Sequence, residues 1–190
     1  PALGTWLERL QGAELIALDT ETTSLDYMRA ELVGLSFAVE PGQAAYLPLA
    51  HDYPGGPKQL DREQVLERMR PLLEDPERPK VGQNLKYDIK VLHRYKVPVN
   101  GPLFDTMLAH YLINPDMRHN MDVLAETYLN YSPVPITELI GKKGKNQLSM
   151  REVPLGEVTE YAVEDADVTL QLSRHFAPEL EEAGVVSLFK

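Results

Sequence analysis

Two carboxylates at the end of an apolar run constrain this chain more than any other feature. Residues 15–26 read LIALDTETTSLD, in which a segment suited to the middle of a sheet leads into Asp19 and Glu21. Side chains alternate along a strand, so both carboxylates point to one side and Thr20 to the other. A carboxylate removed from water without a partner is costly. We therefore expect the fold to bring a basic side chain or a metal ion to this pair.

The length and composition indicate one globular domain, residues 1–190. The chain is 43% hydrophobic, which is enough for a substantial core. No apolar run approaches the ~20 residues of a membrane helix, and the N-terminus lacks a signal-peptide pattern. The absence of cysteine excludes disulfides and thiolate metal ligands. We expect a cytoplasmic monomer without membrane contact and, because the chain begins at Pro1, a domain excised from a larger protein.

The net charge of the chain limits the kinds of partner it can have. The formal charge is -10, which argues against a general nucleic-acid binder with a basic surface. It remains compatible with an enzyme that meets phosphate groups through divalent cations.

Strand patterns come first along the chain. Apolar runs predict strands at residues 14–20, 31–39 and 43–50, the last two joined by the turn EPGQ. These three segments suit an antiparallel meander. A further short strand is expected at residues 79–84, before a helix. This order predicts an α/β fold, with a mixed sheet that combines the meander with parallel strands and is flanked by helices.

Helical periodicity begins at Asp61, where apolar side chains share one face and Gln64 completes a capping-box pattern. The helix after the fourth strand is expected to begin near Leu85. Further helices are expected at residues 105–113, 121–129 and 157–182. The stretch 131–155 contains Pro, Gly and Lys and is expected to be irregular.

A polar cluster marks the strand-to-helix junction GQNLKYDIKVL. Asp88 falls in the first helical turn, where capping of the helix N-terminus is the simplest explanation. Junctions of this kind also hold ligands. A ligand-binding role therefore stays open because four polar neighbours share the turn: Gln83, Asn84, Lys86 and Tyr87.

The segment EYAVEDADVTLQL predicts a helix with an inward-facing carboxylate. Tyr161 and Asp165 lie four residues apart, on a face that an apolar stripe continues to Leu172. Glu164 and Asp167 project elsewhere and are expected to be solvated. An aromatic core position with an Asp at its rim is the alternative to a functional pair.

Together these segments predict several inward carboxylates with few basic residues beside them. Hard divalent cations such as Mg²⁺ or Mn²⁺ take oxygen ligands and offset negative charge. Two such ions about 3.5–4 Å apart form a clamp for displacement at phosphorus. The histidines show no metal-ligand spacing and are expected at the surface or behind the site: His51, His93, His110, His119 and His175.

Three segments carry a resemblance to a known family: DTETTSLD, VGQNLKYD and YAVEDADVT. In order and spacing they resemble the exonuclease motifs of the 3′→5′ proofreading domain of bacterial DNA polymerase I, a family A polymerase. The likeness continues through LVGLSFAVEPGQAAYLPLAHDY, FDTML and GKKGKNQL, and so covers nearly the whole chain. It implies an RNase H-like fold, the tyrosine branch of the DEDD exonuclease superfamily, and a covalently linked polymerase domain.

The resemblance also implies roles for the carboxylates. Asp19, Glu21 and Asp165 would hold the first of two divalent cations, Mg²⁺ or Mn²⁺, with Zn²⁺ as an alternative at this first site. Asp19 would bridge to the second ion, and Asp88 would act mainly through coordinated water. Tyr161 and Glu21 would position the attacking water. The implied reaction releases deoxynucleoside 5′-monophosphates from a single-stranded DNA 3′ end.

Six further positions match family residues near the terminal nucleotides and phosphates: Thr20, Leu25, Gln83, Asn84, Tyr87 and Arg118. The apolar Leu25 is implied to lie beside the terminal bases, where stacking contacts tolerate any base. The chain departs from some relatives at Ile136 and Thr137, where they carry an aromatic residue that packs on the single strand.

Two other functions are compatible with these residues. An exoribonuclease of the same branch, trimming RNA 3′ ends, needs the same carboxylates. A non-catalytic module that holds a single strand is expected to have lost ligands, whereas this chain retains all four carboxylates and the tyrosine. The basic cluster of Lys142, Lys143 and Lys145 either contacts DNA or forms a solvated loop face.

Overall fold

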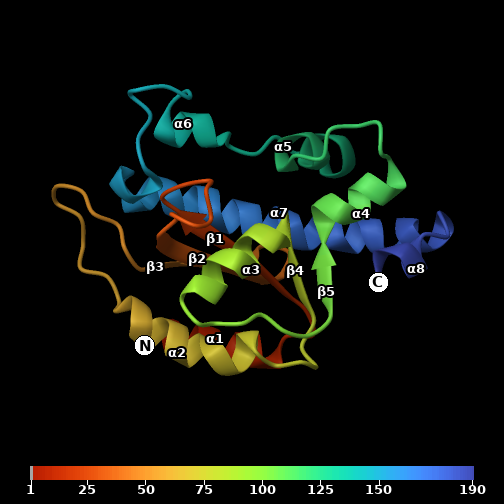
Figure 1. Cartoon of the computed structure of the whole chain (residues 1–190), viewed down its shortest axis with the longest axis horizontal. Coiled ribbons are helices and arrows are strands. Elements are labelled where there is room, and N and C mark those ends of the chain that lie inside the picture. Colours follow the sequence, from red (N-terminus) through yellow and green to blue (C-terminus); the bar gives the residue numbers. More distant parts are fainter. Residues whose placement is uncertain (1) are drawn as a thin grey trace.

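The computed structural model describes residues 2–190 and has three layers, with a five-stranded sheet between two layers of helices (Figure 1). The strand order is β3-β2-β1-β4-β5. The strands β1 (Ile16–Thr22), β2 (Leu32–Glu40) and β3 (Gln43–Pro48) are antiparallel neighbours. The strands β4 (Lys80–Gly82) and β5 (Leu103–Asp105) continue the sheet in parallel with β1. The predicted mixed sheet is confirmed.

The strand β1 lies further along the chain than predicted. The sequence places its end at residue 20, whereas β1 continues because its backbone stays paired with β2 as far as Thr22 and Leu32. The register shifts between Glu21 and Thr22, next to the last pair. Asp19 and Glu21 therefore both lie on a paired strand, and the sheet fixes the direction of their side chains.

The long helix α7 (Leu155–Glu182) crosses one face of the sheet and confirms the helix expected at residues 157–182 (Figure 1). It packs there against strand residues with small side chains, which allow the helix to come close. Its contact with the sheet is a fully buried cluster of Ala17, Ala38, Val81, Ala166 and Leu170.

The opposite face of the sheet is covered by α1 (Ala2–Gly12), α2 (Arg62–Leu73) and α3 (Leu85–Arg94). Larger side chains fill this side, including Ile16 and Leu18 of β1. The helix α1 was not predicted. It is amphipathic and docks on the same core through Leu3, Leu7 and Leu10.

The remaining helices lie around α7. The helix α4 (Thr106–Ile113) matches its prediction, and α5 (Met121–Leu124) continues into a π-helical turn, Ala125–Leu129. The stretch expected to be irregular contains two helical pieces, α6 (Ile136–Ile140) and a 3₁₀ turn, Met150–Glu152. A capping box closes this 3₁₀ turn, so a local hydrogen-bond motif explains part of the order.

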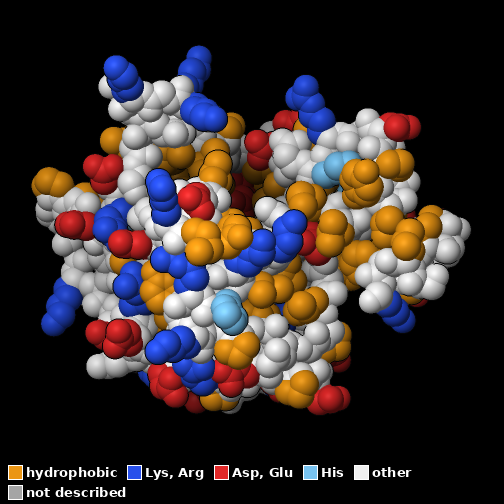
Figure 2. All heavy atoms as spheres, viewed as in Figure 1, with side chains coloured by type: hydrophobic (Ala, Val, Ile, Leu, Met, Phe, Trp, Pro, Cys, Tyr) orange, Lys and Arg blue, Asp and Glu red, His pale blue; other side chains and the backbone are white. Residues whose placement is uncertain are grey.

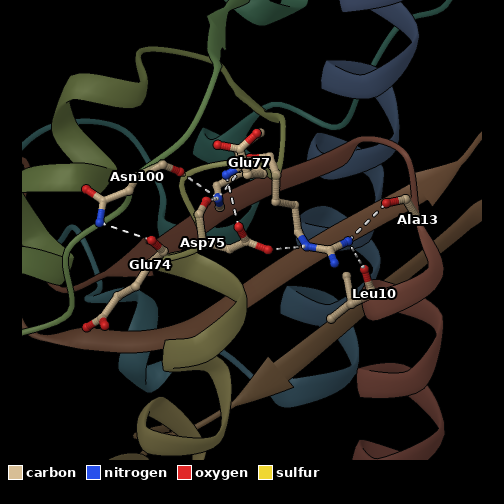
Figure 3. A network of polar contacts seen from close by, with 8 residues as sticks. Leu10, Ala13, Glu74, Asp75, Glu77 and Asn100 are labelled. Carbon is tan, nitrogen blue, oxygen red and sulfur yellow. Dashed lines mark hydrogen bonds and ion pairs between the residues drawn. The ribbon is translucent and has the colours of Figure 1, made fainter.

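A buried lysine fastens the sheet end farthest from the carboxylates. Lys80 of β4 is fully buried, and its ammonium donates to the carbonyls of Asp75, Arg78 and Asn100 at 3.1, 3.0 and 2.6 Å. Figure 3 shows these segments converging, with the Asn100 side chain in turn donating to the Glu74 carbonyl. Burial lowers the pKa of Lys80, and the three acceptors compensate its lost hydration.

Within residues 2–190, no helix combines the length and the apolar character needed to cross a bilayer.

Candidate active site

Three carboxylates from two elements meet between the sheet and α7. Asp19 and Glu21 leave β1 on the side that faces α7, and Asp165 of α7 lies opposite them. One oxygen of each residue lies within 4.8 Å of the others. Figure 2 shows a hollow in this face of the molecule with acidic side chains inside it and Lys and Arg side chains projecting from the surrounding surface.

The three carboxylates strongly disfavour one another's charge. Burial raises the pKa of Asp19 to about 7. Burial, followed by the charges of Asp19, Asp165 and Asp88, raises the pKa of Glu21 well above its usual value. The pKa of Asp165 is raised by burial and then by Asp19. Without a compensating cation, this group would hold protons at neutral pH.

The donor set fits a divalent cation. The Oε1 atom of Glu21 is buried without a hydrogen-bond partner, and none of the ion pairs among residues 2–190 includes Asp19, Glu21 or Asp165. A buried polar atom without a partner is rare in folded proteins. Oxygen-only ligands crowded in this way suit a hard ion such as Mg²⁺ or Mn²⁺.

Asp88 approaches the group from α3 and stands outside the set of three. It is buried, and its carboxylate accepts from the amide and the hydroxyl of Thr20 at 3.1 and 2.6 Å. Burial and the charge of Asp19 raise its pKa. Capping of α3, the simplest explanation from sequence, is not its role, because the cap residue Asn84 lies ahead of it in a left-handed conformation.

The carboxylate that caps α3 is Asp105, which the sequence analysis missed. At the end of β5 it accepts from the amides of Asn84 and Leu85 at 3.1 and 2.8 Å. It also accepts from Met107 and Leu108 at the start of α4. One buried side chain thus satisfies the first amides of two helices, next to the turn that carries Asp88.

Tyr161 lies one helical turn before Asp165, as predicted, and its ring lies close enough to the carboxylates to feel their charge. Burial, followed by the charges of Asp165, Glu21 and Asp19, raises the pKa of Tyr161. The hydroxyl is therefore protonated and has a hydrogen to donate.

Glu164 and Asp167, expected to be solvated, are both half-buried and hydrogen-bonded. Glu164 accepts from the Tyr131 hydroxyl and, at 3.0 Å, from the Val134 amide. Asp167 accepts from the Gly42 amide at 3.1 Å. Both side chains thus remain partly in solvent, as expected, but they also bind other segments that reach this face of α7, which the helical spacing alone does not reveal.

The six residues matched to DNA contacts divide into two groups. Leu25 is 93% exposed, and Arg118 is also exposed. The lysines of the loop after α6 are exposed as well.

The side-chain polar atoms of Thr20, Gln83 and Tyr87 are engaged within the protein, whereas Asn84 is held through its backbone amide, which donates to Asp105. The Thr20 hydroxyl donates to Asp88, and the Tyr87 hydroxyl bonds to Thr22 and to the Ser24 carbonyl. Gln83 accepts from Thr106 and donates to the carbonyl of His119 at 2.7 Å.

Two of the histidines expected at the surface or behind the site, His51 and His110, are buried. His110 is fully buried, with its Nδ1 atom 2.7 Å from that of His119 and its Nε2 atom 3.0 Å from the Tyr128 hydroxyl. His51 is also buried, and its Nε2 atom lies 2.7 Å from the Tyr46 hydroxyl. Local periodicity does not predict this burial, because side chains from other elements, Tyr46 of β3 and Tyr128 of the π-helical turn, cover the two rings.

The chain is similar to known proteins over nearly its whole length. A family model described as 3′-5′ exonuclease matches residues 2–181. DNA polymerase I of Pseudomonas aeruginosa is 49% identical over 179 residues, which are 93% of this chain and 20% of that protein. DNA polymerase I of Rhizobium leguminosarum is 39% identical over 206 residues, covering 99% of this chain and 20% of that protein. The chain thus spans about a fifth of the length of these curated relatives.

Solved structures share the fold at low sequence identity. Pol1 of M. smegmatis, in complex with DNA primer-template and dNTP, has a TM-score of 0.74 and 19% identity, with 98% of this chain and 28% of that chain covered. RNase D of Escherichia coli, an exoribonuclease, has a TM-score of 0.71 and 20% identity, with 97% and 44% covered. The expected RNase H-like architecture is confirmed, and the chain belongs to the 3′-5′ exonuclease domain family of DNA polymerase I.

Proposed function

We propose that this domain is the proofreading exonuclease of a DNA polymerase. It would hydrolyse phosphodiester bonds at single-stranded or frayed DNA 3′ ends and release deoxynucleoside 5′-monophosphates. The observation that carries the proposal is the group of three carboxylate oxygens within 4.8 Å, beside a protonated tyrosine. The identity to polymerase I sequences supports DNA as the substrate and a covalently linked polymerase domain as the source of the DNA end.

Two divalent cations, Mg²⁺ or Mn²⁺, are the proposed cofactors. Asp19, Glu21 and Asp165 would hold one, and Asp19 with Asp88 the other. A structure of the same fold, NrnC of Brucella melitensis, is described with bound Mg²⁺ (TM-score 0.67, 20% identity). When bound, such ions offset the carboxylate charge and stabilise the negative charge that develops at phosphorus.

Tyr161 and Glu21 are the proposed positioning groups for the attacking water. The raised pKa of Tyr161 keeps its hydroxyl a hydrogen-bond donor. Glu21 offers Oε1, which has no hydrogen-bond partner in the protein, as an acceptor. A donor and an acceptor at fixed positions define the orientation of one water and the direction of its attack.

The DNA end would lie against the exposed Leu25, with Arg118 near its phosphates. An apolar contact accepts any base, as the removal of all mismatches requires. Selectivity would come from fraying, because a mismatched terminus costs less to unpair. The net charge of -10 predicts weak binding of DNA by the domain alone.

The test is degradation of a 5′-labelled single-stranded DNA by the 190-residue chain, with Mg²⁺, Mn²⁺ or EDTA. The variants Asp19→Asn and Asp165→Asn, checked for folding by circular dichroism, serve as controls. We expect a metal-dependent ladder that shortens from the 3′ end and is lost in both variants. If a matched RNA strand is degraded faster than the DNA, the function is trimming of RNA 3′ ends and not proofreading. A folded wild-type chain that degrades neither strand would contradict the exonuclease proposal.

A further inference from the structure

We infer that Tyr46 and His51 form a positioning pair for the carboxylate site, in which the tyrosine ring, held by the histidine, fixes the side chain of Glu21. The pair lies on β3 and the loop that follows it, outside the residues assigned to metal or DNA. The inference rests on the proposed function, because it concerns how the same site is held ready for its cation and water.

The first observation concerns the place opposite Glu21 in the sheet. In the antiparallel register, Glu21 of β1 pairs with Gly34 of β2. A Cβ atom at Gly34 would lie only 2.1 Å from the hydroxyl oxygen of Tyr46 and 2.3 Å from its Cζ atom. The end of the Tyr46 ring therefore occupies the volume that a side chain at position 34 would need.

This placement brings the tyrosine hydroxyl beside Glu21. Side chains directly opposite one another in an antiparallel pair have Cβ atoms about 4.5–5.5 Å apart. Tyr46 thus acts as the cross-strand neighbour of Glu21, although it belongs to the next strand. Gly34 is required at this position because any larger residue would displace the ring.

The second observation is the shared surroundings of Tyr46 and Tyr161. Both rings pack against one small cluster, Met150, Val153 and Val158. The charges of Glu21 and Asp19 reach Tyr46 and, after the larger effect of burial, raise its pKa. Two protonated tyrosines therefore lie near the carboxylates, and Tyr46 has been given no role.

The third observation is the rigid attachment of His51. Its ring meets the Tyr46 hydroxyl at 2.7 Å, in an edge-on arrangement with ring centroids 5.8 Å apart. The side chain of Gln59 accepts from the His51 amide at 2.7 Å and donates to the His51 carbonyl at 2.8 Å. This clamp fixes the histidine, the histidine fixes the phenol oxygen, and the ring limits the positions open to Glu21.

The test removes only the hydroxyl, with Tyr46→Phe, and compares it with Tyr95→Phe. Tyr95 is a matched control, because its hydroxyl accepts from the amide of Leu32 and its ring packs in the core on the other face of the sheet from α7. Two quantities are measured: Mn²⁺ affinity by calorimetry without DNA, and kcat and KM on single-stranded DNA. We expect Tyr46→Phe to weaken Mn²⁺ binding or lower kcat by about tenfold, the usual effect of losing a group that orients a ligand, with KM within about twofold.

A double variant tests whether the two residues act together. If they form one unit, Tyr46→Phe with His51→Asn loses no more than Tyr46→Phe alone, since both break the same contact. Mn²⁺ affinity and kcat within about twofold of wild type in Tyr46→Phe, or an equal loss in Tyr95→Phe, would overturn the inference. If the wild-type chain binds Mn²⁺ but degrades no DNA, the proposed function is contradicted. The Mn²⁺ affinity of Tyr46→Phe then still tests whether Tyr46 positions the carboxylate site.

Discussion

The hydroxyl of Thr20 donates a 2.6 Å hydrogen bond to Asp88, and the Thr20 amide donates a second bond of 3.1 Å to the same oxygen. Thr20 lies between Asp19 and Glu21 on β1 and points to the other side of the strand. The strand β1, which carries Asp19 and Glu21 toward α7, therefore also positions Asp88 of α3. Because side chains alternate along β1, this one strand contacts Asp88 on one side and contributes to the group of three carboxylates on the other.

Replacing Thr20 with Val tests whether its hydroxyl positions Asp88, separately from any change in the free energy of unfolding. The substitution keeps the side-chain shape and removes only the hydroxyl, so we expect kcat to fall roughly 10- to 100-fold through loss of orientation at Asp88. Thr20→Ser keeps the hydroxyl and should retain most of the activity. Single-turnover hydrolysis with urea unfolding of each variant is the measurement. Equal activity in the Val and Ser variants would refute a positioning role for the hydroxyl.

The metal-free protein should lose stability as the pH rises. Asp19 has a pKa of about 7 when folded against an ordinary value of 3.8, so the folded state retains a proton that the unfolded state releases. Asp19 by itself therefore makes unfolding progressively more favourable between about pH 4 and about pH 7. The raised pKa values of Glu21, Asp88 and Asp165 act in the same direction.

Urea unfolding in EDTA at about pH 5 and about pH 8 measures this loss. The variant Asp19→Asn isolates the carboxylate, because it should be the more stable protein at the higher pH. Added Mg²⁺ should restore wild-type stability there by binding only the folded state. If the free energy of unfolding of wild type does not fall relative to that of Asp19→Asn over this interval, the ionised carboxylates do not destabilise the metal-free fold.

Loss of Asp105 should destabilise the fold more than loss of an ordinary helix cap. Its carboxylate is buried and serves four amides of α3 and α4. We expect Asp105→Ala to cost about 2–4 kcal/mol, because several buried donors lose their acceptor. Asp61 is the control, since it is exposed and accepts only from the Gln64 amide, and its loss should cost about 1 kcal/mol. Similar midpoints for the two variants in urea would disprove this account.

The exposed Leu25 should matter for DNA and not for folding. It buries almost nothing in the free protein, so Leu25→Ala should change stability by less than about 0.5 kcal/mol. Affinity for single-stranded DNA should fall by about 1 kcal/mol, close to fivefold, through the lost contact with a terminal base. The nearby exposed Met28 provides the control variant Met28→Ala, and a filter-binding titration compares the two. An equal effect of both variants would argue against a specific contact at Leu25.

Much of the fold could be predicted because its strongest patterns are local. The alternating strands and the long apolar stripe of α7 are visible in sequence and were found at nearly their true positions. The strand β5 was missed because three residues are too short to show a period. The helix α1 was missed although it is longer, because Gly4 and Gly12 interrupt its pattern and no acidic residue marks its first turn.

The site was predicted less evenly. The spacing within β1 and within α7 placed Asp19 with Glu21 and Tyr161 with Asp165, but only the crossing of α7 over the sheet brings the pairs together. Asp105 carries a visible signal, an acidic residue just before a helix. Its second task at α3 is a contact across 21 residues and leaves no local trace.

The most direct test of the central claim counts bound Mn²⁺ by electron paramagnetic resonance while following hydrolysis of single-stranded DNA. The comparison is wild type against Glu21→Gln, which keeps the shape of the side chain and removes its charge from the group. The account predicts saturable Mn²⁺ binding in wild type, a rate that follows occupancy, and loss of both in the variant. Hydrolysis that persists in metal-free protein, or in a variant that no longer binds Mn²⁺, would contradict it.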